Sequence, residues 1–390
     1  MTRRSVGLVL SGGGARGAYE VGVLKYISDH LPTLLDRVRI ISGSSVGAVN
    51  AVHLASFGLS RTGVGRLVDL WQHLRLDDSI GVAPMNALRL VGSAPMRLLR
   101  KGVRSPAQGL LQADQMWKLI ARETNWFALG RHLERGRFDA IALSGTDIRS
   151  GETHVWVQGH GPHVRGLHRP TPISDFVAYP TKLGLRHVLA SAAIPLLFSP
   201  VKIRGRWYMD GGIRQNTPLG PALHFGADAL LTVSLRSEGT VEVPNGLFPG
   251  VGQVIGKLLD SLFLDRLSFD IDRLQRINDV LAAAAALGPE VETQLQAQLT
   301  AMGRPAYRHI ECVAVGPSED IGRIAAEVIR HSPDVGNLSF IRVLSALFED
   351  DERASGDAAS FLLFDGAFAK RLIALGQKDA AAHHDQLAML

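Results

Sequence analysis

The sequence predicts an α/β protein with a mostly parallel central sheet flanked by helices and with helical insertions. Two observations support this class. Apolar runs over residues 6–10, 38–41 and 229–235 have the length and composition of buried strands. The first two runs are each followed by a stretch with apolar residues at helical spacing. Strands that alternate with helices are typical of a parallel sheet, because each helix carries the chain back to the start of the next strand.

The remaining elements follow from the same patterns. Further strands are expected at 138–144, 152–158, 201–203, 207–209 and 308–315. Helices are expected at 18–26, 48–57, 185–193, 222–225 and 258–302, and again from 320 to 390. Residues 160–172 are rich in Gly, His and Pro and are expected to form a loop.

These elements divide the chain into three parts. Residues 6–236 form the expected core, interrupted at about 59–136 by a helical excursion without a clear strand. Residues 237–305 are expected to be a helical insert, in effect an added layer of helices. Residues 306–390 supply a final strand and C-terminal helices that complete the core.

Composition narrows the class of protein without choosing a function. The chain has 390 residues, of which 46% are hydrophobic and 20% charged, as in a folded globular protein. Its net charge of +5 is compatible with anionic lipid or nucleic acid as a partner. The single cysteine, Cys312, lies in an apolar stretch and is expected to be a core thiol. Since no signal peptide or transmembrane run is visible, a cytoplasmic location is expected.

A nucleophile motif lies at the end of the second expected strand. Gly43, Ser45 and Gly47 form a G-x-S-x-G pentapeptide between a strand and a helix. This is the context that a nucleophile elbow requires, because the serine occupies a strained turn and the glycines remove clashing Cβ atoms. Its position near the start of the chain argues against an ordinary α/β-hydrolase, in which several strands usually precede the elbow.

A glycine loop follows the first expected strand. Gly12, Gly13, Gly14 and Arg16 lie where a strand passes into a helix, and such loops present backbone N–H groups to an anion. We therefore expect an oxyanion hole here. The spacing also fits a dinucleotide-binding motif, but that motif needs an acidic residue at the end of the second strand, and residues 42–44 are Ser-Gly-Ser.

The base that would activate Ser45 has two candidates. Asp210, followed by Gly211 and Gly212, could accept the proton if the carboxylate is partly desolvated. His187 is the alternative that we retain.

Other histidines are less suited to catalysis or metal binding. His53 is eight residues beyond Ser45, about 12 Å along a helix, and cannot reach back. His160, His163 and His168 share a loop without nearby Cys or carboxylate, so an exposed loop is favoured over a metal site. No metal site is predicted.

Four motifs, in their order along the chain, resemble those of a known protein family. The segments GGGARG, GSSVG, ASAAIPLLFSP and DGG, over roughly residues 6–235, resemble the motif series of patatin-like phospholipases. The resemblance implies a Ser-Asp dyad of Ser45 and Asp210, an oxyanion hole at the glycine loop, and hydrolysis of acyl esters of glycerolipids. It implies no cofactor and no nucleic-acid partner, and a phospholipid or other acyl lipid as the substrate.

Two other functions stay open at this point. A soluble esterase or thioesterase could use the same dyad on small acyl substrates. A nucleotide- or lipid-binding regulatory protein could keep the glycine loop without turnover. The sequence does not indicate an oligomeric state.

A basic segment suggests where a lipid substrate could be met. Residues 79–113 contain no Asp or Glu, and five cationic residues alternate there with apolar ones. Such a segment can lie at a membrane surface, with Arg and Lys at anionic head groups. The alternative is a helical cover over the sheet with a solvated basic edge, and it is favoured because Gly92, Pro95 and Gly102 break any long amphipathic helix.

Overall fold

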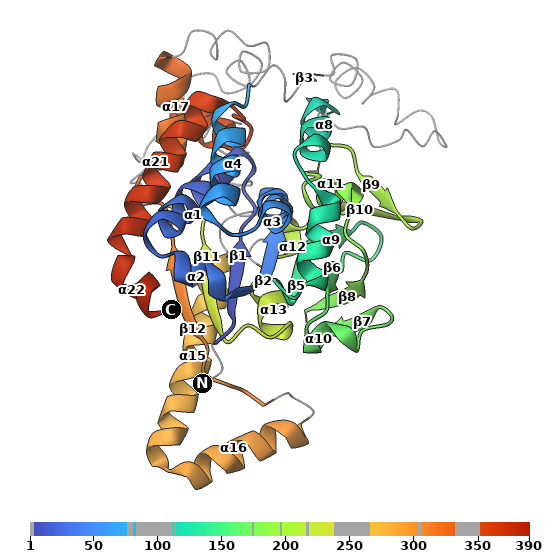
Figure 1. Ribbon diagram of the computed structural model, residues 1–390, viewed down its shortest axis with the longest axis vertical. Coiled ribbons are helices and arrows are strands. Elements are labelled where there is room, and N and C mark those ends of the chain that lie inside the picture. The colour runs from blue at the N-terminus through green and yellow to red at the C-terminus, as the bar shows by residue number, and fades with distance from the viewer. Residues whose placement is uncertain are drawn as a thin grey trace, which may run out of the picture.

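The computed structural model describes most of the chain. The described residues are 4–75, 81–82, 111–112, 114–173, 175–195, 197–215, 218–237, 266–302, 306–331 and 352–390. They form a ten-stranded sheet with helices on both faces (Figure 1). The predicted α/β fold class is confirmed.

One half of the sheet is parallel throughout. Its order is β12-β11-β1-β2-β5, and every neighbouring pair in this run is parallel. The bounds are β1 Val6–Leu10, β2 Val38–Ser44, β5 Ala140–Asp147, β11 Ala229–Val233 and β12 Glu311–Val315. From β1 the chain adds β2 and β5 on one side and later β11 and β12 on the other, so the strand order reverses at β1 and a crevice is expected at its carboxyl end.

The other half of the sheet is mixed. Strand β6 (Thr153–Gly159) is antiparallel to β5, and β8 (Phe176–Pro180) and β7 (Thr171–Ile173) continue the sheet beyond it. The hairpin of β9 (Val201–Ile203) and β10 (Arg206–Asp210) pairs with β5 through β10. Part of the expected 160–172 loop is therefore structured, since β7 begins within it.

The helices are numbered along the chain. The first group is η1 Gly14–Gly17, α1 Ala18–His30, α2 Pro32–Arg37, α3 Val46–Phe57, α4 Arg61–Gln72, α8 Asp114–Arg122 and α9 Trp126–Glu134. The second is α10 Pro162–Arg165, α11 Leu185–Ser191, α12 Gly212–Gln215, α13 Leu219–His224, α15 Arg266–Leu287 and α16 Pro289–Ala301. The last is α17 Ile321–His331, α20 Glu352–Ser360, α21 Gly366–Ala382 and α22 His384–Met389.

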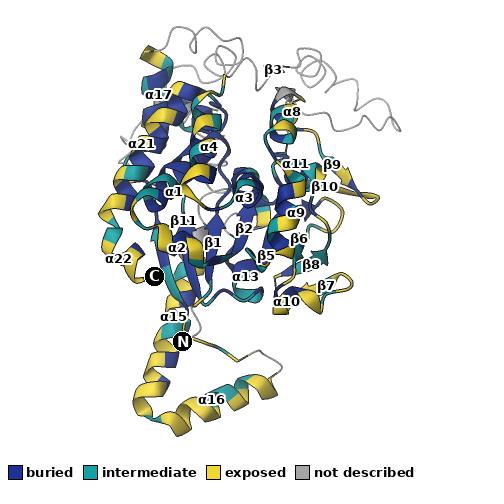
Figure 2. Cartoon of the chain, in the orientation of Figure 1, coloured by how far each residue is buried: buried dark blue, intermediate teal, exposed yellow. Residues whose placement is uncertain are grey.

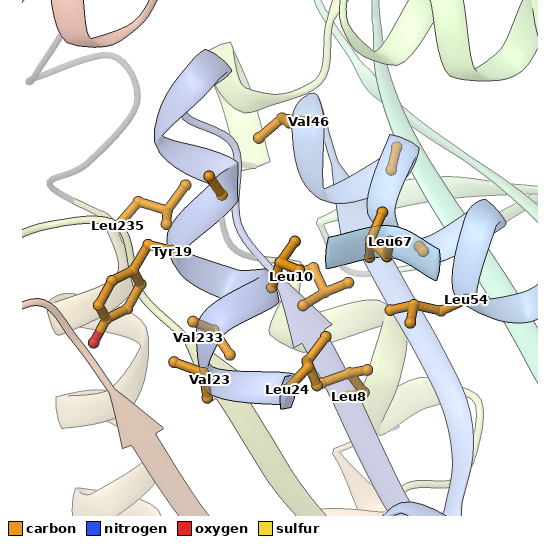
Figure 3. Close-up of a cluster of buried hydrophobic side chains, with 14 of the residues drawn as sticks. Leu8, Leu10, Tyr19, Val23, Leu24, Val46, Leu54, Leu67, Val233 and Leu235 are labelled. Carbon is orange, nitrogen blue, oxygen red and sulfur yellow. The ribbon is translucent and has the colours of Figure 1, made fainter. Parts of the chain in front are cut away.

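Alternating strand residues fill two cores, one on each face of the sheet. Leu8 and Leu10 of β1 face the larger core, whereas Val9 faces the smaller one. In Figure 3 the leucines of β1 meet Leu24 of α1 and Leu54 of α3. The strands that carry the site are therefore buried on both sides, as parallel strands usually are.

The excursion after α3 differs from the prediction in one respect. Its described parts include the helices α4, α8 and α9, but also a two-stranded antiparallel pair, β3 (Gly81–Val82) and β4 (Leu111–Gln112). The expectation of no strand there was wrong, because strands of two residues carry no periodicity that a sequence pattern can reveal. The remainder of the basic segment 79–113 lies outside the described residues.

In its described part, the helical insert covers less of the sheet than an added layer of helices would. Helix α15 buries Leu274 in the smaller core, and Leu281 and Ala284 are also buried. Helix α16 has no buried residue, and Figure 2 shows it largely exposed beyond the sheet. Because so little of α16 is covered, the described part of the insert is an arm attached through α15.

The C-terminal helices return to the first helix. Tyr19 of α1 donates its hydroxyl to Asp379 of α21 at 3.0 Å, and Asp379 also accepts the Ser318 amide at 3.0 Å. Both Tyr19 and Asp379 are buried. The end of the chain is thus packed against the element that follows the glycine loop. Among the described helices, none has the length and hydropathy needed to cross a bilayer.

Candidate active site

Ser45 lies on a strained turn between β2 and α3. Its backbone has φ 52° and ψ −124°, in the region that side-chain-bearing residues rarely adopt. Its carbonyl accepts the Ala48 amide at 3.0 Å and so begins the helix. Its own amide donates to the Ser191 hydroxyl at 3.0 Å. These bonds hold the strained conformation, and the side chain is only 1% exposed.

The motif glycines are required by close backbone approach. A Cβ on Gly47 would collide with the main-chain carbonyl of Leu10, and one on Gly43 would collide with the carbonyl of Gly47. A Cβ on Gly211 would strike the carbonyl of Ser144. The Gly47 contact also places the start of α3 against the end of β1, where the glycine loop begins.

Asp210 contacts the serine from the end of β10. The Ser45 hydroxyl donates to Asp210 Oδ2 at 2.6 Å, and the Gly212 amide donates to Oδ1 at 2.7 Å. The main chain of Asp210 is also held, because its amide donates to Ala193 at 2.9 Å and its carbonyl accepts the Thr146 hydroxyl at 2.9 Å. Both carboxylate oxygens therefore have partners in a fixed frame.

Burial raises the pKa of the Asp210 carboxyl group into the range useful for proton transfer. Desolvation raises the pKa of Asp210 to about 7, against the opposing effect of the bonds from Ser45 and Gly212. A carboxyl group with a pKa near neutrality can take up and release a proton at physiological pH. The pair can therefore exchange a proton at the Ser45 oxygen.

The glycine loop lies beside this pair. Gly14 has φ 59°, and a Cβ there would overlap the Phe361 carbonyl oxygen, so only glycine fits. That carbonyl accepts the Ala15 amide at 2.9 Å, and the Arg16 amide donates to Gly13 at 3.2 Å. Within the described residues, the amides of Gly13 and Gly14 donate to no protein acceptor. Those two groups are the candidates to bind an anion.

Other members of the predicted loop have structural contacts. Gly12 is buried at the start of the loop. The Arg16 guanidinium extends to the C-terminal region, where Nε donates to the Ser360 hydroxyl at 2.8 Å and the group lies 4.1 Å from the centroid of the Phe361 ring. The sequence placed Arg16 in the loop, and the direction of its side chain depends on the tertiary structure.

A buried polar network under the loop was not anticipated. Glu20 Oε1 accepts the Ser11 amide at 2.7 Å, and Oε2 accepts the Asn50 side-chain amide at 2.8 Å. Asn50 in turn accepts the Trp71 indole N–H at 3.0 Å. Burial raises the pKa of Glu20 to about 8. The available signal was a carboxylate and an amide within otherwise apolar helical stretches.

Ser191 was also missed as a site residue. Its hydroxyl accepts the Ser45 amide, and its carbonyl accepts the Gly211 amide at 3.1 Å. It thus supports both halves of the pair from α11. The segment ASAAIPLLFSP contains it, but no pattern in that segment assigns a role to one serine.

The two histidines considered above have other surroundings. His187 Nδ1 accepts the Gly184 amide at 3.1 Å and its ring meets Trp156 edge-on, while burial lowers its pKa to about 4. His53 is buried on α3, and burial lowers its pKa to about 4 as well. It is Asp210 that receives the bond from Ser45. The described part of the chain contains no cluster of three or more potential metal ligands.

Curated proteins are similar in sequence to part of this chain. An uncharacterized NTE family protein of Mycobacterium tuberculosis is 28% identical over 232 residues, which are 59% of this chain and 49% of that protein. Lysophospholipase NTE1 of Mycosarcoma maydis is 22% identical over 244 residues, which are 60% of this chain and 10% of that protein. The chain thus spans half or less of the length of these curated relatives.

A solved structure and a family model complete the comparison. The crystal structure of VipD from Legionella pneumophila aligns with 95% of this chain and 67% of its own, at 13% identity and a TM-score of 0.35. The family model described as patatin-like phospholipase matches residues 8–223, which include the glycine loop, the elbow and Asp210. Because that model covers more than half of the sequence, this chain belongs to the patatin-like phospholipase family.

Proposed function

We propose that this chain is a lipid acyl hydrolase of the phospholipase A or lysophospholipase type. Family membership and the name of the lysophospholipase relatives support the reaction class. The observation that carries the proposal is the 2.6 Å hydrogen bond between the buried Ser45 hydroxyl and Asp210, formed at a strained turn beside a glycine loop. The substrate would be a phospholipid or another acyl lipid.

The proposed reaction has two steps through an acyl-enzyme. Ser45 Oγ attacks the ester carbonyl while Asp210 Oδ2 takes the hydroxyl proton, and the amides of Gly13 and Gly14 stabilise the oxyanion. Collapse of the intermediate expels the alcohol, which receives the proton from Asp210. Asp210 then accepts a proton from the water that attacks the acyl group, and it returns this proton to Ser45 Oγ as the fatty acid is released. No metal or cofactor takes part.

Labelling with a fluorophosphonate tests the nucleophile. We expect rapid covalent modification of Ser45, located by mass spectrometry of the peptide, and no modification in Ser45→Ala. Ser191→Ala is a useful comparison, because Ser191 carries a buried hydroxyl that is bonded to the elbow and should not be the labelled residue. Absence of labelling would contradict the dyad and favour a regulatory protein that binds lipid or nucleotide without turnover.

Product analysis tests the substrate class. Incubation with mixed phospholipid and lysophospholipid vesicles should release free fatty acid, and mass spectrometry of the remaining lipid identifies the position cleaved. Ser45→Ala supplies the blank. Hydrolysis of short soluble esters with no release from any lipid would favour an esterase or thioesterase instead.

A further inference from the structure

The glycine loop is bonded to a segment that lies at the other end of the sequence. Arg16 Nε donates to the Ser360 hydroxyl at 2.8 Å across a separation of 344 residues, and the Arg16 guanidinium donates to the Asp357 carbonyl at 3.4 Å. Ser360 also donates to the Asp357 carbonyl at 2.6 Å. The Phe361 carbonyl accepts the Ala15 amide. The end of α20 therefore contacts the loop through both side chain and main chain.

These contacts are buried. Arg16 is 3% exposed and Ser360 is fully buried, and the guanidinium lies over the Phe361 ring. A buried guanidinium is costly unless its N–H groups are bonded, so the side chain has a strong preference for this one arrangement. Arg16 and Ser360 together fix where the Phe361 carbonyl sits relative to the loop.

The Phe361 carbonyl in turn sets the direction of the loop peptides. It occupies the space that a Cβ on Gly14 would need and bonds to the next amide, so Gly14 is held at φ 59°. A rotation at Gly14 would turn its own amide and that of Gly13 away from their present direction. Oxyanion donors act over 2.7 to 3.1 Å, and a small misalignment removes most of their effect.

We propose that Asp357–Phe361 is part of the oxyanion-hole scaffold, and that Arg16 and Ser360 are positioning residues that act on the transition state through the Gly13 and Gly14 amides. This inference rests on the proposed function, since it assigns a role in that same reaction. It extends the site to a segment beyond the residues that the family model matches.

The test compares Arg16→Gln, Ser360→Ala and the double variant. Ser28→Ala is the matched control, because Ser28 is a buried hydroxyl on α1 that donates to the Lys25 carbonyl at the far end of that helix. For each protein we would measure kcat and KM on a soluble ester, the rate of fluorophosphonate labelling at Ser45, and the melting temperature.

We expect both single variants to lower kcat about tenfold or more while KM stays within about twofold, because a misaligned donor weakens the transition state more than the ground state. The labelling rate should fall in the same proportion. The double variant should be no worse than the poorer single variant, since both changes release the same carbonyl. Ser28→Ala should match the wild type in kcat.

Three results would overturn the inference. Normal kcat and labelling in both variants would show that the loop does not depend on this segment. A fall in kcat that merely follows melting temperature, and that Ser28→Ala reproduces at equal loss of stability, would show a structural role. If the losses of kcat in the two single variants added up fully in the double variant, Arg16 and Ser360 would act independently and not through the same carbonyl. If Arg16→Gln does not fold, the kcat and labelling rate of Ser360→Ala alone test the inference, because this variant keeps the Arg16 guanidinium.

The same experiment separates this inference from the proposed function. Wild-type protein that neither hydrolyses esters nor labels at Ser45 would contradict both. Wild-type protein that does both, alongside variants that match it, would contradict only the role of Asp357–Phe361.

Discussion

At the scale of single residues, burial and hydrogen bonding shift the pKa of Asp210 in opposite directions. Asp210 is fully buried, which favours its neutral form, while Ser45 and Gly212 donate bonds that favour the carboxylate. Asp147 lies on the neighbouring strand and is equally buried, but it is paired with Arg206 at 3.1 Å. The pKa values of the two aspartates shift in opposite directions, because Asp147 accepts bonds from the Arg206 guanidinium and from the Arg149 and Ser150 amides, whereas burial dominates at Asp210.

The first prediction concerns the pH dependence of hydrolysis. Since Asp210 must be ionised to accept the Ser45 proton and its pKa is raised to about 7, kcat/KM on a soluble ester should rise with pH and level off above about 7. The profile should be measured from pH 5 to 9. An inflection near pH 4, the ordinary range for a carboxyl group, would contradict the assignment.

The second prediction concerns stability. The pKa of Asp210 is higher in the folded chain than its ordinary value of 3.8, so its contribution to stability is present below pH 3.8 and is lost as pH rises through about 7. Asp210→Asn has no ionisable group at this position, so its stability should not fall over this pH range for that reason. The variant should therefore gain melting temperature relative to the wild type between about pH 4 and 7, while hydrolysis is abolished.

Asp147→Asn provides the opposite sign as a control. Burial alone would raise the pKa of Asp147, but the bonds from Arg206, Ser150 and Arg149 outweigh it and hold the pKa below 3.8. Its contribution is present above 3.8 and is lost as pH falls through the lowered value. Asp147→Asn should be destabilised at pH 7, and equal effects of both variants on melting would refute the argument.

At the scale of elements, helix α3 can begin at Ser45 only because it approaches β1 closely. Its first turn packs on the main chain of Leu10 through Gly47. The predicted helix at 48–57 and strand at 6–10 are both present. The close distance between them, however, is possible only because Gly47 has no Cβ. Strands β7 and β8 were not predicted, because β7 begins in a stretch rich in Gly, His and Pro and β8 ends in Pro180.

The third prediction compares two glycines in helices. Gly47→Ala should destabilise the protein by about 1 to 3 kcal/mol, because a methyl group there has no room against β1. Gly65→Ala in α4 should be neutral or stabilising by up to about 1 kcal/mol, because its Cβ would meet nothing within 4 Å. Urea denaturation of both variants checks this. Similar stability in the two would show that α3 can shift at no cost.

At the scale of the whole molecule, segments near the two ends of the sequence meet beside the glycine loop. Residues 352–390 cover α1 and contact the glycine loop, and the red C-terminal helix α21 lies beside the blue α1 in Figure 1. The described part of residues 306–390 therefore packs against elements from the start of the sequence, and the division of the chain into three parts stays a prediction.

The fourth prediction tests this closure. Asp379→Ala removes the acceptor of both the Tyr19 hydroxyl and the Ser318 amide, and should cost about 1 to 3 kcal/mol of unfolding free energy. Its kcat should fall less than that of Ser360→Ala, because Asp379 bonds to the Tyr19 side chain and the Ser318 amide and not to the glycine loop itself. Lys378→Ala, which removes only an exposed ion pair with Glu319, should melt like the wild type. A larger effect from Lys378→Ala would contradict the packing argument.

The fifth prediction concerns the membrane surface and rests on the sequence. Replacing Arg97, Arg100, Lys101 and Arg104 with Gln should weaken binding to anionic vesicles by up to about 1 kcal/mol for each charge, with a smaller difference at high salt. Hydrolysis of a short soluble ester should not change. Unaltered vesicle binding in a flotation assay would assign the segment to the scaffold.

The sequence by itself determined the local chemistry of this protein. A strand, a glycine-flanked serine and a helix specify a nucleophile elbow, because the strained turn depends on residues adjacent in the chain. The glycine loop and the strands of the parallel core follow from equally local patterns. The family resemblance then predicted Asp210 as the partner of Ser45, which the residues alone did not distinguish from His187.

Only the tertiary structure decided how distant groups meet. The bond from Ser45 to Asp210 spans 165 residues and the bond from Arg16 to Ser360 spans 344. Ser191 and Glu20 acquire their roles from the same packing. Periodicity reports which face of an element is buried, but a hydrogen bond between elements depends on where the whole sheet and its helices bring two side chains.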